Sequence, residues 1–308
     1  CIRDSLECYA WLLTSGSISD IHAHDRHEQG TERDIMLPVN GQVHSVSAKG
    51  LHPLPATPTN GHNPSSQTTL RRPALHQTTG DRPVILFATQ HYKPSNSIRI
   101  EQLNACLAHN KELGIFDEII LLMEDVDNDA NTDSCQTIYL GRRAGFSDFL
   151  EIVSSPDWSD HHIVFSNSDV FMSEDILLAA KQLYSPSSVI ALTRRELDGE
   201  FPPFYQGLSQ DTWIMKGHPV NQLLRDTAKL ALGIAGCENI FTAQLIANGY
   251  NVWNPCLDIR TTHNDPSPNH NYGDRKRYYG FYAFPAPCHI RDVESSIPEY
   301  QFEFQPIA

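Results

Sequence analysis

Asn167, Ser168 and Asp169 stand where an apolar stretch of the sequence ends, and their side chains could do chemistry. The segment before them, "HIVFS" at 162–166, has the pattern of a buried strand. A buried carboxylate at a strand end is costly unless it meets a metal ion, a cationic side chain or a ligand donor. Oxygen ligands such as the Asp169 carboxylate suit Mg²⁺ or Mn²⁺. The structural alternative is that Asp169 begins a turn or caps the next helix.

Glu238 and Asp211 are candidate catalytic residues, because a carboxylate within hydrogen-bond reach of a hydroxyl can take its proton. Glu238, in "GCENIFTAQL", begins an expected helix, where the helix dipole alone also favours an acidic residue. Asp211, in "SQDTWIM", could instead bind hydroxyl groups of a ligand. Trp213 beside it either forms an apolar wall of a ligand site or belongs to the core.

Strands and helices alternate from residue 82 onward. The expected strands are 82–89, 118–123, 162–166 and 188–193, and the expected helices are 97–114, 146–153 and 174–183. This alternation predicts an α/β fold, a Rossmann-related and mostly parallel sheet with helices on both faces. In such sheets ligands bind beyond the carboxyl ends of the strands, where the strand order reverses. Asn167–Asp169 would lie at such a place.

The order of these segments resembles GT-A-type nucleotide-sugar glycosyltransferases over residues 82 to 280. The segments that carry the resemblance are "RPVILFATQHYKPSNSIRIEQLNACLAHN", "DEIILLMED", "HIVFSNSDVFM", "ALTRRE", "SQDTWIM" and "GCENIFTAQLIANGYNVWNPCLDI". Enzymes of this family carry an Asp-x-Asp triplet whose last Asp binds Mn²⁺ or Mg²⁺, and the metal bridges the donor diphosphate. Here the triplet reads Asn-Ser-Asp, so Asn167 replaces the first acid while Asp169 remains.

The resemblance implies roles for further residues. His263, with His270 as a fallback, would complete the metal shell, and Glu238 would be the general base of an inverting enzyme. Donor-binding residues would lie at the carboxyl ends of the strands and the start of the first helix, where the positive helix end favours phosphates. They are Thr89, Gln90, Arg99, Asn167, Ser168 and Trp213, with Arg142 or Arg143 assisting.

The function that this implies is transfer of a sugar from a nucleoside-diphosphate sugar to a glycan or other hydroxyl acceptor, with Mn²⁺ or Mg²⁺ as cofactor. Two alternatives stay open. A sugar nucleotidyltransferase would want a Gly-rich basic signature after the first strand, where this chain has "TQHYKPSNS". A noncatalytic sugar- or nucleotide-binding module is favoured by the replacement of an acid by Asn167.

Two other stretches imitate metal sites. "EDVDNDANTD" at 124–133 holds literal Asp-x-Asp triplets, but Ala130 and Gln136 stand where an EF-hand needs Gly and Glu, so we expect a solvated acidic loop. "HAHDRH" at 22–27 is similar to a metallo-β-lactamase motif, with its acid one place early. We expect only adventitious metal affinity there.

The amino-acid composition of the chain argues against several classes of binding partner. A formal net charge of −14 argues against nonspecific binding to nucleic acid and to anionic membranes. The sequence has no run of 18 apolar residues, so we expect no transmembrane segment. It also has no Gly-rich fingerprint of the kind that binds ATP or NAD. The seven cysteines form no Cys-x-x-Cys pair, and no Asn-x-Ser/Thr site has a permitted middle residue. Both observations favour a reducing, cytoplasmic compartment, although the sequence specifies no location.

The chain divides into three expected segments. Residues 1–80 are rich in Pro, Ser, Thr, Gly, Asn and His and read as a disordered or linker-like tail. Residues 81–262 form the expected GT-A-like catalytic domain. Residues 263–308 complete it, either as a flap over the ligand or as a segment packed on the sheet edge.

Overall fold

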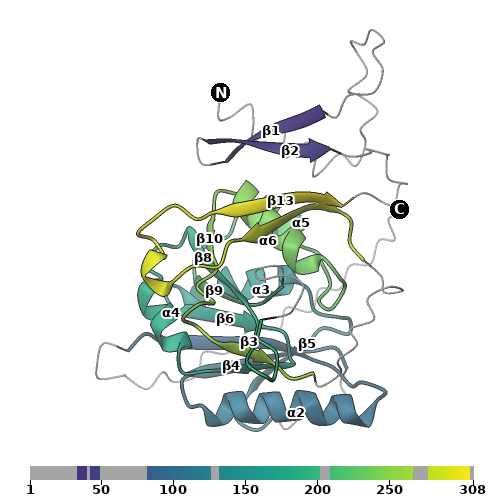
Figure 1. Ribbon diagram of the computed structural model, residues 1–308. Helices are drawn as coiled ribbons and strands as arrows, with labels where there is room; N and C mark the ends of the chain where they lie inside the picture. The colour runs from purple at the N-terminus through teal and green to yellow at the C-terminus, as the bar shows by residue number, and fades with distance from the viewer. Residues whose placement is uncertain are drawn as a thin grey trace.

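A seven-stranded sheet organises the computed structural model, which describes residues 33–39, 42–48, 82–125, 132–201, 209–265 and 277–305, the first two as backbone only. The strand order is β10-β8-β9-β6-β3-β4-β5 (Figure 1). The strands are β3 (Ile85–His91), β4 (Glu118–Met123), β5 (Gln136–Tyr139), β6 (His162–Ser166), β8 (Ser188–Thr193), β9 (Gln210–Lys216) and β10 (Asn251–Trp253).

All neighbouring strands of this sheet run parallel except β9, which is antiparallel to both β6 and β8. The prediction of an α/β fold with a mostly parallel sheet is therefore confirmed. The chain goes from β3 outward to β4 and β5 and then returns to β6 on the other side of β3. The strand order thus reverses between β3 and β6, and this is where a ligand site is expected.

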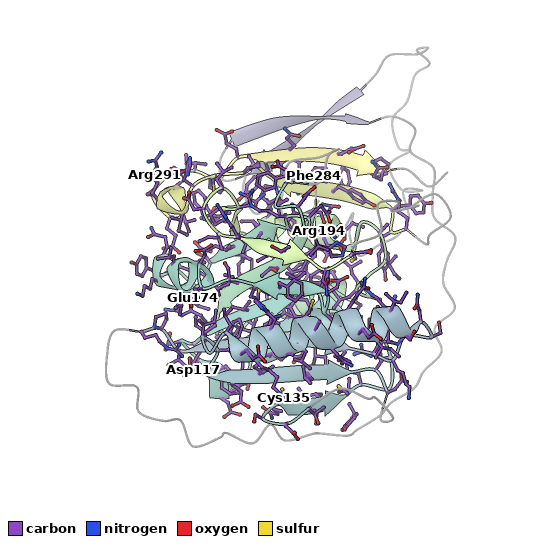
Figure 2. All side chains as sticks on the ribbon, turned by 60° about the horizontal axis from the view of Figure 1, so that its bottom comes forward. Asp117, Cys135, Glu174, Arg194, Phe284 and Arg291 are labelled. Carbon is purple, nitrogen blue, oxygen red and sulfur yellow. The ribbon has the colours of Figure 1, made fainter. Side chains whose placement is uncertain are left out.

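Helices cover both faces because alternate side chains of each buried strand point to opposite sides. Ile85 and Phe87 of β3 share one core with α4 (Ile176–Gln182), whereas Leu86 and Ala88 share the other with α3 (Phe146–Val153). The first face also carries α2 (Ser97–Glu112), and the second carries α5 (Gln222–Thr227) and α6 (Cys237–Ala247). Figure 2 shows the side chains that fill these layers, from Asp117 and Cys135 near the β4–β5 edge to Phe284 beyond the opposite edge.

Helix α2 begins at Ser97, as expected, and ends at Glu112, two residues before the expected end at 114. The Asn96 side chain accepts a hydrogen bond from the Ile98 backbone N–H at 2.9 Å, so Asn96 is the N-cap. Gly114 follows the last turn with a φ of +64°, a conformation that costs glycine little. These two ends fix α2 with Arg99 in its first turn, beside the carboxyl end of β3.

A second, two-stranded sheet lies beyond the main one and carries site residues. Strand β7 (Val170–Met172) pairs antiparallel with β11 (Thr261–His263), and Arg195 forms a bridge with Thr262. The backbone N–H of Asn264 donates to the Asp169 carbonyl at 2.7 Å. Three chain segments that leave β6, β8 and β10 therefore meet at this small sheet.

The described part of the C-terminal segment is packed on the domain. Strands β12 (Gly280–Pro285) and β13 (Tyr300–Gln305) form a hairpin, joined through the short helix η3 (Ile290–Asp292), and β12 lies against α6. Tyr282 and Phe284 belong to the same core as α3 and α6. A further short helix, η2 (Pro156–Trp158), precedes β6. The segment boundary expected between residues 262 and 263 falls inside β11.

Of residues 1–80, the structure describes the backbone of a hairpin, β1 (Arg33–Val39) and β2 (Gln42–Ala48), which the sequence did not suggest. The "HAHDRH" motif, His270 and residues 126–131 of the acidic loop lie outside the described residues. Within the described part of the chain, no helix is both long and apolar enough to cross a bilayer.

Candidate active site

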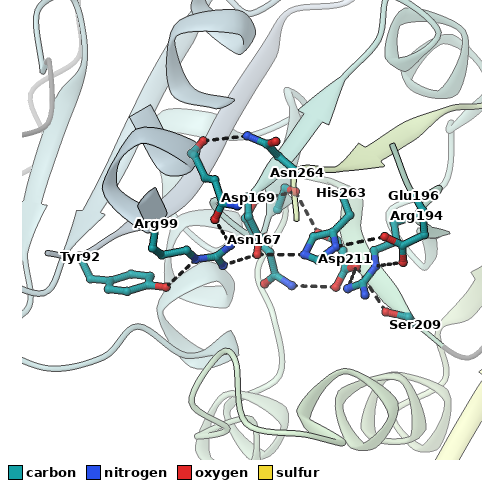
Figure 3. A network of polar contacts seen from close by, with 12 residues as sticks. Tyr92, Arg99, Asn167, Asp169, Arg194, Glu196, Ser209, Asp211, His263 and Asn264 are labelled. Atoms are coloured by element: carbon teal, nitrogen blue, oxygen red, sulfur yellow. Dashed lines mark hydrogen bonds and ion pairs between the residues drawn. The ribbon is translucent and has the colours of Figure 1, made fainter. Parts of the chain in front are cut away.

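Asp169 is the centre of a polar cluster at the point where the strand order reverses (Figure 3). It is buried, and its Oδ2 is shared by two cationic groups. Arg99 Nη2 forms an ion pair with this oxygen, and His263 Nε2 lies 3.1 Å from it. Ser168 and Asp169 form the turn that follows β6, and the Asp169 carboxylate faces across to Arg99 of α2 and His263 of β11.

The surroundings of Asp169 keep it ionised. Burial by itself would raise its pKa, but the hydrogen bonds and positive charges of His263 and Arg99 outweigh burial and hold the pKa well below its usual range. Burial by itself would lower the pKa of His263, but the hydrogen bonds to Asp169 and Glu196 outweigh burial and raise this pKa to about 9. Without a ligand, the two side chains therefore form a buried ion pair.

Asp211 lies in a second cluster next to the first. Its Oδ2 accepts from Arg194 Nη1 at 2.7 Å and from Ser209 Oγ at 3.3 Å, and its Oδ1 accepts from Asn167 Nδ2 at 2.8 Å. The antiparallel strand β9 brings Asp211 here, since its register pairs Thr212 with Ser166 at the end of β6. With both oxygens engaged, Asp211 is suited to holding Arg194 and Asn167 in place.

Glu238 stands in the first turn of α6, whose N-cap is Gly236 in a left-handed conformation with a φ of +85°. Burial raises the pKa of Glu238 to about 7, and the negative charge of Asp211 acts in the same direction. A carboxylate with that pKa is half ionised near neutral pH, which is the condition under which a general base works best.

No protein-family model matches the sequence, and no curated protein matches it. Solved structures do share part of its architecture. The chain is similar to the apo-form glycosyltransferase GlyE of Streptococcus pneumoniae, at 12% identity and a TM-score of 0.38 over 63% of this chain. It spans 57% of the length of that protein and 58% of another GlyE structure.

Two other similar structures contain ligands. One is a Drosophila β1,4-galactosyltransferase 7 mutant in complex with manganese, UDP-Gal and xylobiose, at 13% identity and a TM-score of 0.34, over 73% of this chain and 95% of that one. The other is glucosyl-3-phosphoglycerate synthase from Mycobacterium tuberculosis in complex with Mn²⁺, UDP and phosphoglyceric acid, at 12% identity and a TM-score of 0.31, over 74% of this chain and 88% of that one.

All three are glycosyltransferases. Because the TM-scores are below 0.5, these similarities do not show what chemistry this chain performs. The chemistry has to be inferred from the chain's own residues.

The expected donor-binding residues Thr89, Gln90, Asn167 and Ser168 all lie at the β3 and β6 ends. Thr89 Oγ1 donates to the Ser166 carbonyl at 2.9 Å and ties the two strand ends together. Among the described residues, Gln90 Oε1 and Asn167 Oδ1 are buried acceptors with no hydrogen-bond partner. Each would gain from a donor on a ligand, because an unpaired buried acceptor costs free energy.

Of the two expected arginines, Arg143 is nearer the site. Arg142 is exposed and forms a bidentate pair with Asp148, at 2.8 and 2.6 Å, at the start of α3. Arg143 instead lies over the ring of Tyr92, 5.7 Å from its centroid, and the Tyr92 hydroxyl accepts from Arg99 Nε at 3.4 Å. The structure thus links Arg143 to the Asp169 cluster and leaves Arg142 in a surface pair.

Trp213 lies in the core, as one of its two sequence interpretations held. Its side chain is 0% exposed and packs against Phe146, Phe165 and Phe241. A sugar cannot stack on a ring that the protein already covers on all sides, so the sugar-wall interpretation of Trp213 does not fit this structure.

Sequence reasoning missed Arg194, Glu196 and Tyr92, which the structure places in the network of Figure 3. Arg194 and Glu196 follow β8, and the carboxyl end of that strand was the one signal that could have drawn attention to them. Charged residues after a strand are common, so the spacing alone did not distinguish them.

The residues present fit a divalent cation that is shared with a ligand. Asp169 and His263 offer one carboxylate and one imidazole, 3.1 Å apart. In the described part of the chain, no three or more His, Cys, Asp or Glu side chains are grouped so that they could hold a metal ion by themselves. Mg²⁺ commonly uses one or two carboxylates and completes its shell with substrate phosphates and water. The site is therefore suited to a metal that binds together with a diphosphate.

Proposed function

We propose that this chain is a metal-assisted glycosyltransferase of the GT-A type, which moves a sugar from a nucleoside-diphosphate sugar to a hydroxyl acceptor. The observation that carries the proposal is the polar cluster at the carboxyl ends of β3 and β6, in which Asp169 stays ionised beside Arg99 and His263. Asn167 connects this cluster to Asp211, and burial together with the negative charge of Asp211 raises the pKa of Glu238 to about 7.

Asp169 and His263 would hold Mn²⁺ or Mg²⁺, which supplies positive charge to the diphosphate when bound. Arg99 adds a second positive charge at the same place and can exchange its bond to Asp169 for one to a phosphate oxygen. At ~3 Å and an effective dielectric constant of ~20, one unit charge stabilises a developing negative charge by about 5 kcal/mol before solvation costs. The unpaired acceptors Gln90 Oε1 and Asn167 Oδ1 would receive hydrogen bonds from the donor.

Glu238 would act on the acceptor. The acceptor oxygen forms a bond to the anomeric carbon while the bond from that carbon to the diphosphate oxygen breaks, and the electron pair of the broken bond stays on the diphosphate. The proton of the acceptor hydroxyl goes to the Glu238 carboxylate. This single displacement inverts the anomeric carbon, so determination of the product configuration by NMR tests the role of Glu238 directly.

A thermal-shift screen tests the donor class. The full chain is heated with UDP-, GDP- and dTDP-sugars, each with and without Mn²⁺. We expect one nucleotide to raise the Tm only when Mn²⁺ is present, since a ligand at 100 times its Kd adds about 2.7 kcal/mol of stability. A screen in which no nucleotide sugar shifts the Tm would contradict the proposal.

The same screen, followed by an assay of nucleoside-diphosphate release, separates the alternatives. The replacement of an acid by Asn167 favours a noncatalytic binding module, which would show a Tm shift without release when acceptors are added. A nucleotidyltransferase would instead release pyrophosphate from a nucleoside triphosphate and a sugar phosphate.

A further inference from the structure

Glu196 lies just beyond the end of β8 and joins the two clusters of the site. Its Oε2 is 3.4 Å from His263 Nδ1, and its Oε1 is 3.4 Å from Arg194 Nε. The side chain is 19% exposed, so it is largely withdrawn from water. Glu196 therefore contacts His263 on the side of the ring opposite to Asp169 (Figure 3).

The backbone fixes this placement. The Arg195 N–H donates to the Thr261 carbonyl at 2.7 Å, and the His263 N–H donates to the Arg195 carbonyl at 2.8 Å. The Glu196 N–H donates to the Glu200 carbonyl at 2.8 Å. Arg195 is thus bonded to β11 through both its N–H and its carbonyl, and these bonds hold the backbone of the next residue, Glu196, beside His263.

An imidazole that binds a metal through Nε2 carries its remaining proton on Nδ1, and metal-bound histidines commonly donate that proton to a carboxylate. We propose that Glu196 is a positioning residue, which accepts the Nδ1–H of His263 both in the ion pair and when Nε2 has lost its proton, and which keeps Nε2 directed at Asp169. The metal part of this inference rests on the proposed function, whereas the hold of Glu196 on the ring does not.

Glu196 is placed to orient rather than to bind the metal. Arg194 engages its other oxygen and also binds Asp211, so the carboxylate is kept beside the ring and its charge is offset. The same bonds connect the metal end of the site to Asp211, whose negative charge acts on Glu238. A change at Glu196 is therefore expected to disturb the metal end first.

The variants Glu196→Ala and Glu196→Gln, made in the full chain, test the inference. Proton NMR of the metal-free protein should show a slowly exchanging Nδ1–H signal from His263, assigned by its absence in His263→Gln. The signal should persist in Glu196→Gln, whose amide oxygen still accepts, and disappear in Glu196→Ala. Titration with MnCl₂ alone should show a Kd weakened by about 10- to 100-fold in Glu196→Ala and less in Glu196→Gln.

Glu200→Ala is the matched control, because Glu200 is an exposed acid four residues away and should leave both readouts unchanged. Circular dichroism verifies that each variant is folded. The inference is overturned if Glu196→Ala keeps both the signal and the Mn²⁺ affinity, or if Glu196→Gln behaves like Glu196→Ala. Loss of the signal in Glu196→Ala, with no Mn²⁺ binding even by the wild type, would support the positioning role and count against the proposed metal-assisted function.

Discussion

At the scale of single residues, the pKa values of two carboxylates are shifted in opposite directions. Asp169 forms an ion pair with Arg99 and a hydrogen bond with His263, so its pKa is lowered. Burial and the negative charge of Asp211 raise the pKa of the half-buried Glu238 to about 7. When the pKa values of two acids are driven apart in this way, one can hold a cation while the other exchanges protons.

We predict that Asp169→Asn abolishes Mn²⁺-dependent donor binding and leaves the fold intact. The amide is neutral and nearly the same size, so it removes the charge that a cation needs while filling the same space. Isothermal titration with Mn²⁺ and the nucleotide that the screen identifies measures the loss. The double variant Asp127→Asn/Asp129→Asn in the acidic loop is the control, and loss of binding there with retention in Asp169→Asn would mean that the wrong triplet had been chosen.

We predict that Glu238→Gln lowers turnover by about 100-fold or more, the usual scale for loss of a general base. Donor affinity should change little, because the base faces the acceptor hydroxyl. The acidic limb of the pH–rate profile, expected near pH 7 in the wild type from the raised pKa, should vanish in the variant. An inverted product together with a fully active Glu238→Gln would exclude Glu238 and leave Asp211 as the candidate base.

Asp211→Asn should move that acidic limb to lower pH. The negative charge of Asp211 raises the pKa of Glu238, whereas Arg194 lowers it. Removing the charge of Asp211 therefore favours the ionised form of Glu238. Cys237 and Tyr282 also face Glu238 and are unchanged. If Asp211 contacts donor hydroxyls, the same variant weakens the selection among donor sugars, and a pH–rate profile that stays in place would contradict the electrostatic coupling.

At the scale of elements, the start of α6 decides where Glu238 lies. Gly236 has a φ of +85°, and a Cβ there would stand 1.9 Å from the Tyr282 hydroxyl oxygen of β12. Tyr282 is 4% exposed and has little room to move. The helix start and the C-terminal hairpin therefore fit together only because residue 236 has no side chain.

We predict that Gly236→Ala lowers both the Tm and the turnover, because the strain and the clash displace the first turn of α6 and Glu238 with it. Gly249→Ala is a matched control: Gly249 has the same φ of +85°, and a Cβ there would meet nothing within 4 Å. It should carry only the left-handed backbone cost of roughly 1–2 kcal/mol. The Tm and the turnover of both variants are measured. Equal losses in Gly236→Ala and Gly249→Ala would show that the Tyr282 contact is unimportant.

At the scale of the whole molecule, the described residues that form the two hydrophobic cores run from Ile85 to Phe302. We predict that deletion of residues 1–78 preserves cooperative unfolding and donor binding, because the composition of that segment predicts no core of its own. Denaturant unfolding monitored by fluorescence, with donor binding on the same sample, measures both. A truncated chain that unfolds without a cooperative transition would place the domain boundary earlier, with the β1–β2 hairpin as the first region to restore.

The sequence by itself determined the class of fold and the position of Asp169. Buried parallel strands leave continuous apolar runs, and helices leave a 3.6-residue period, so β3, β4, β6, β8 and the helices between them were predicted from local patterns. The position at which such an apolar run ends is also visible in the local sequence. Asp169 could therefore be identified at a strand end before any strand had a partner.

Only the tertiary structure decided which side chains meet. The insertion of β9 between β6 and β8, antiparallel to both, brings Asp211 to Asn167 across 44 residues of sequence. The β7–β11 ladder and the bridge at Arg195 bring Glu196 to His263 across 67 residues. Periodicity specifies which face of a strand is buried but not which strand lies beside it, because pairing depends on the packing of the whole chain. For the same reason, burial of Trp213 under three phenylalanines was decided by the packing and not by its neighbours in sequence.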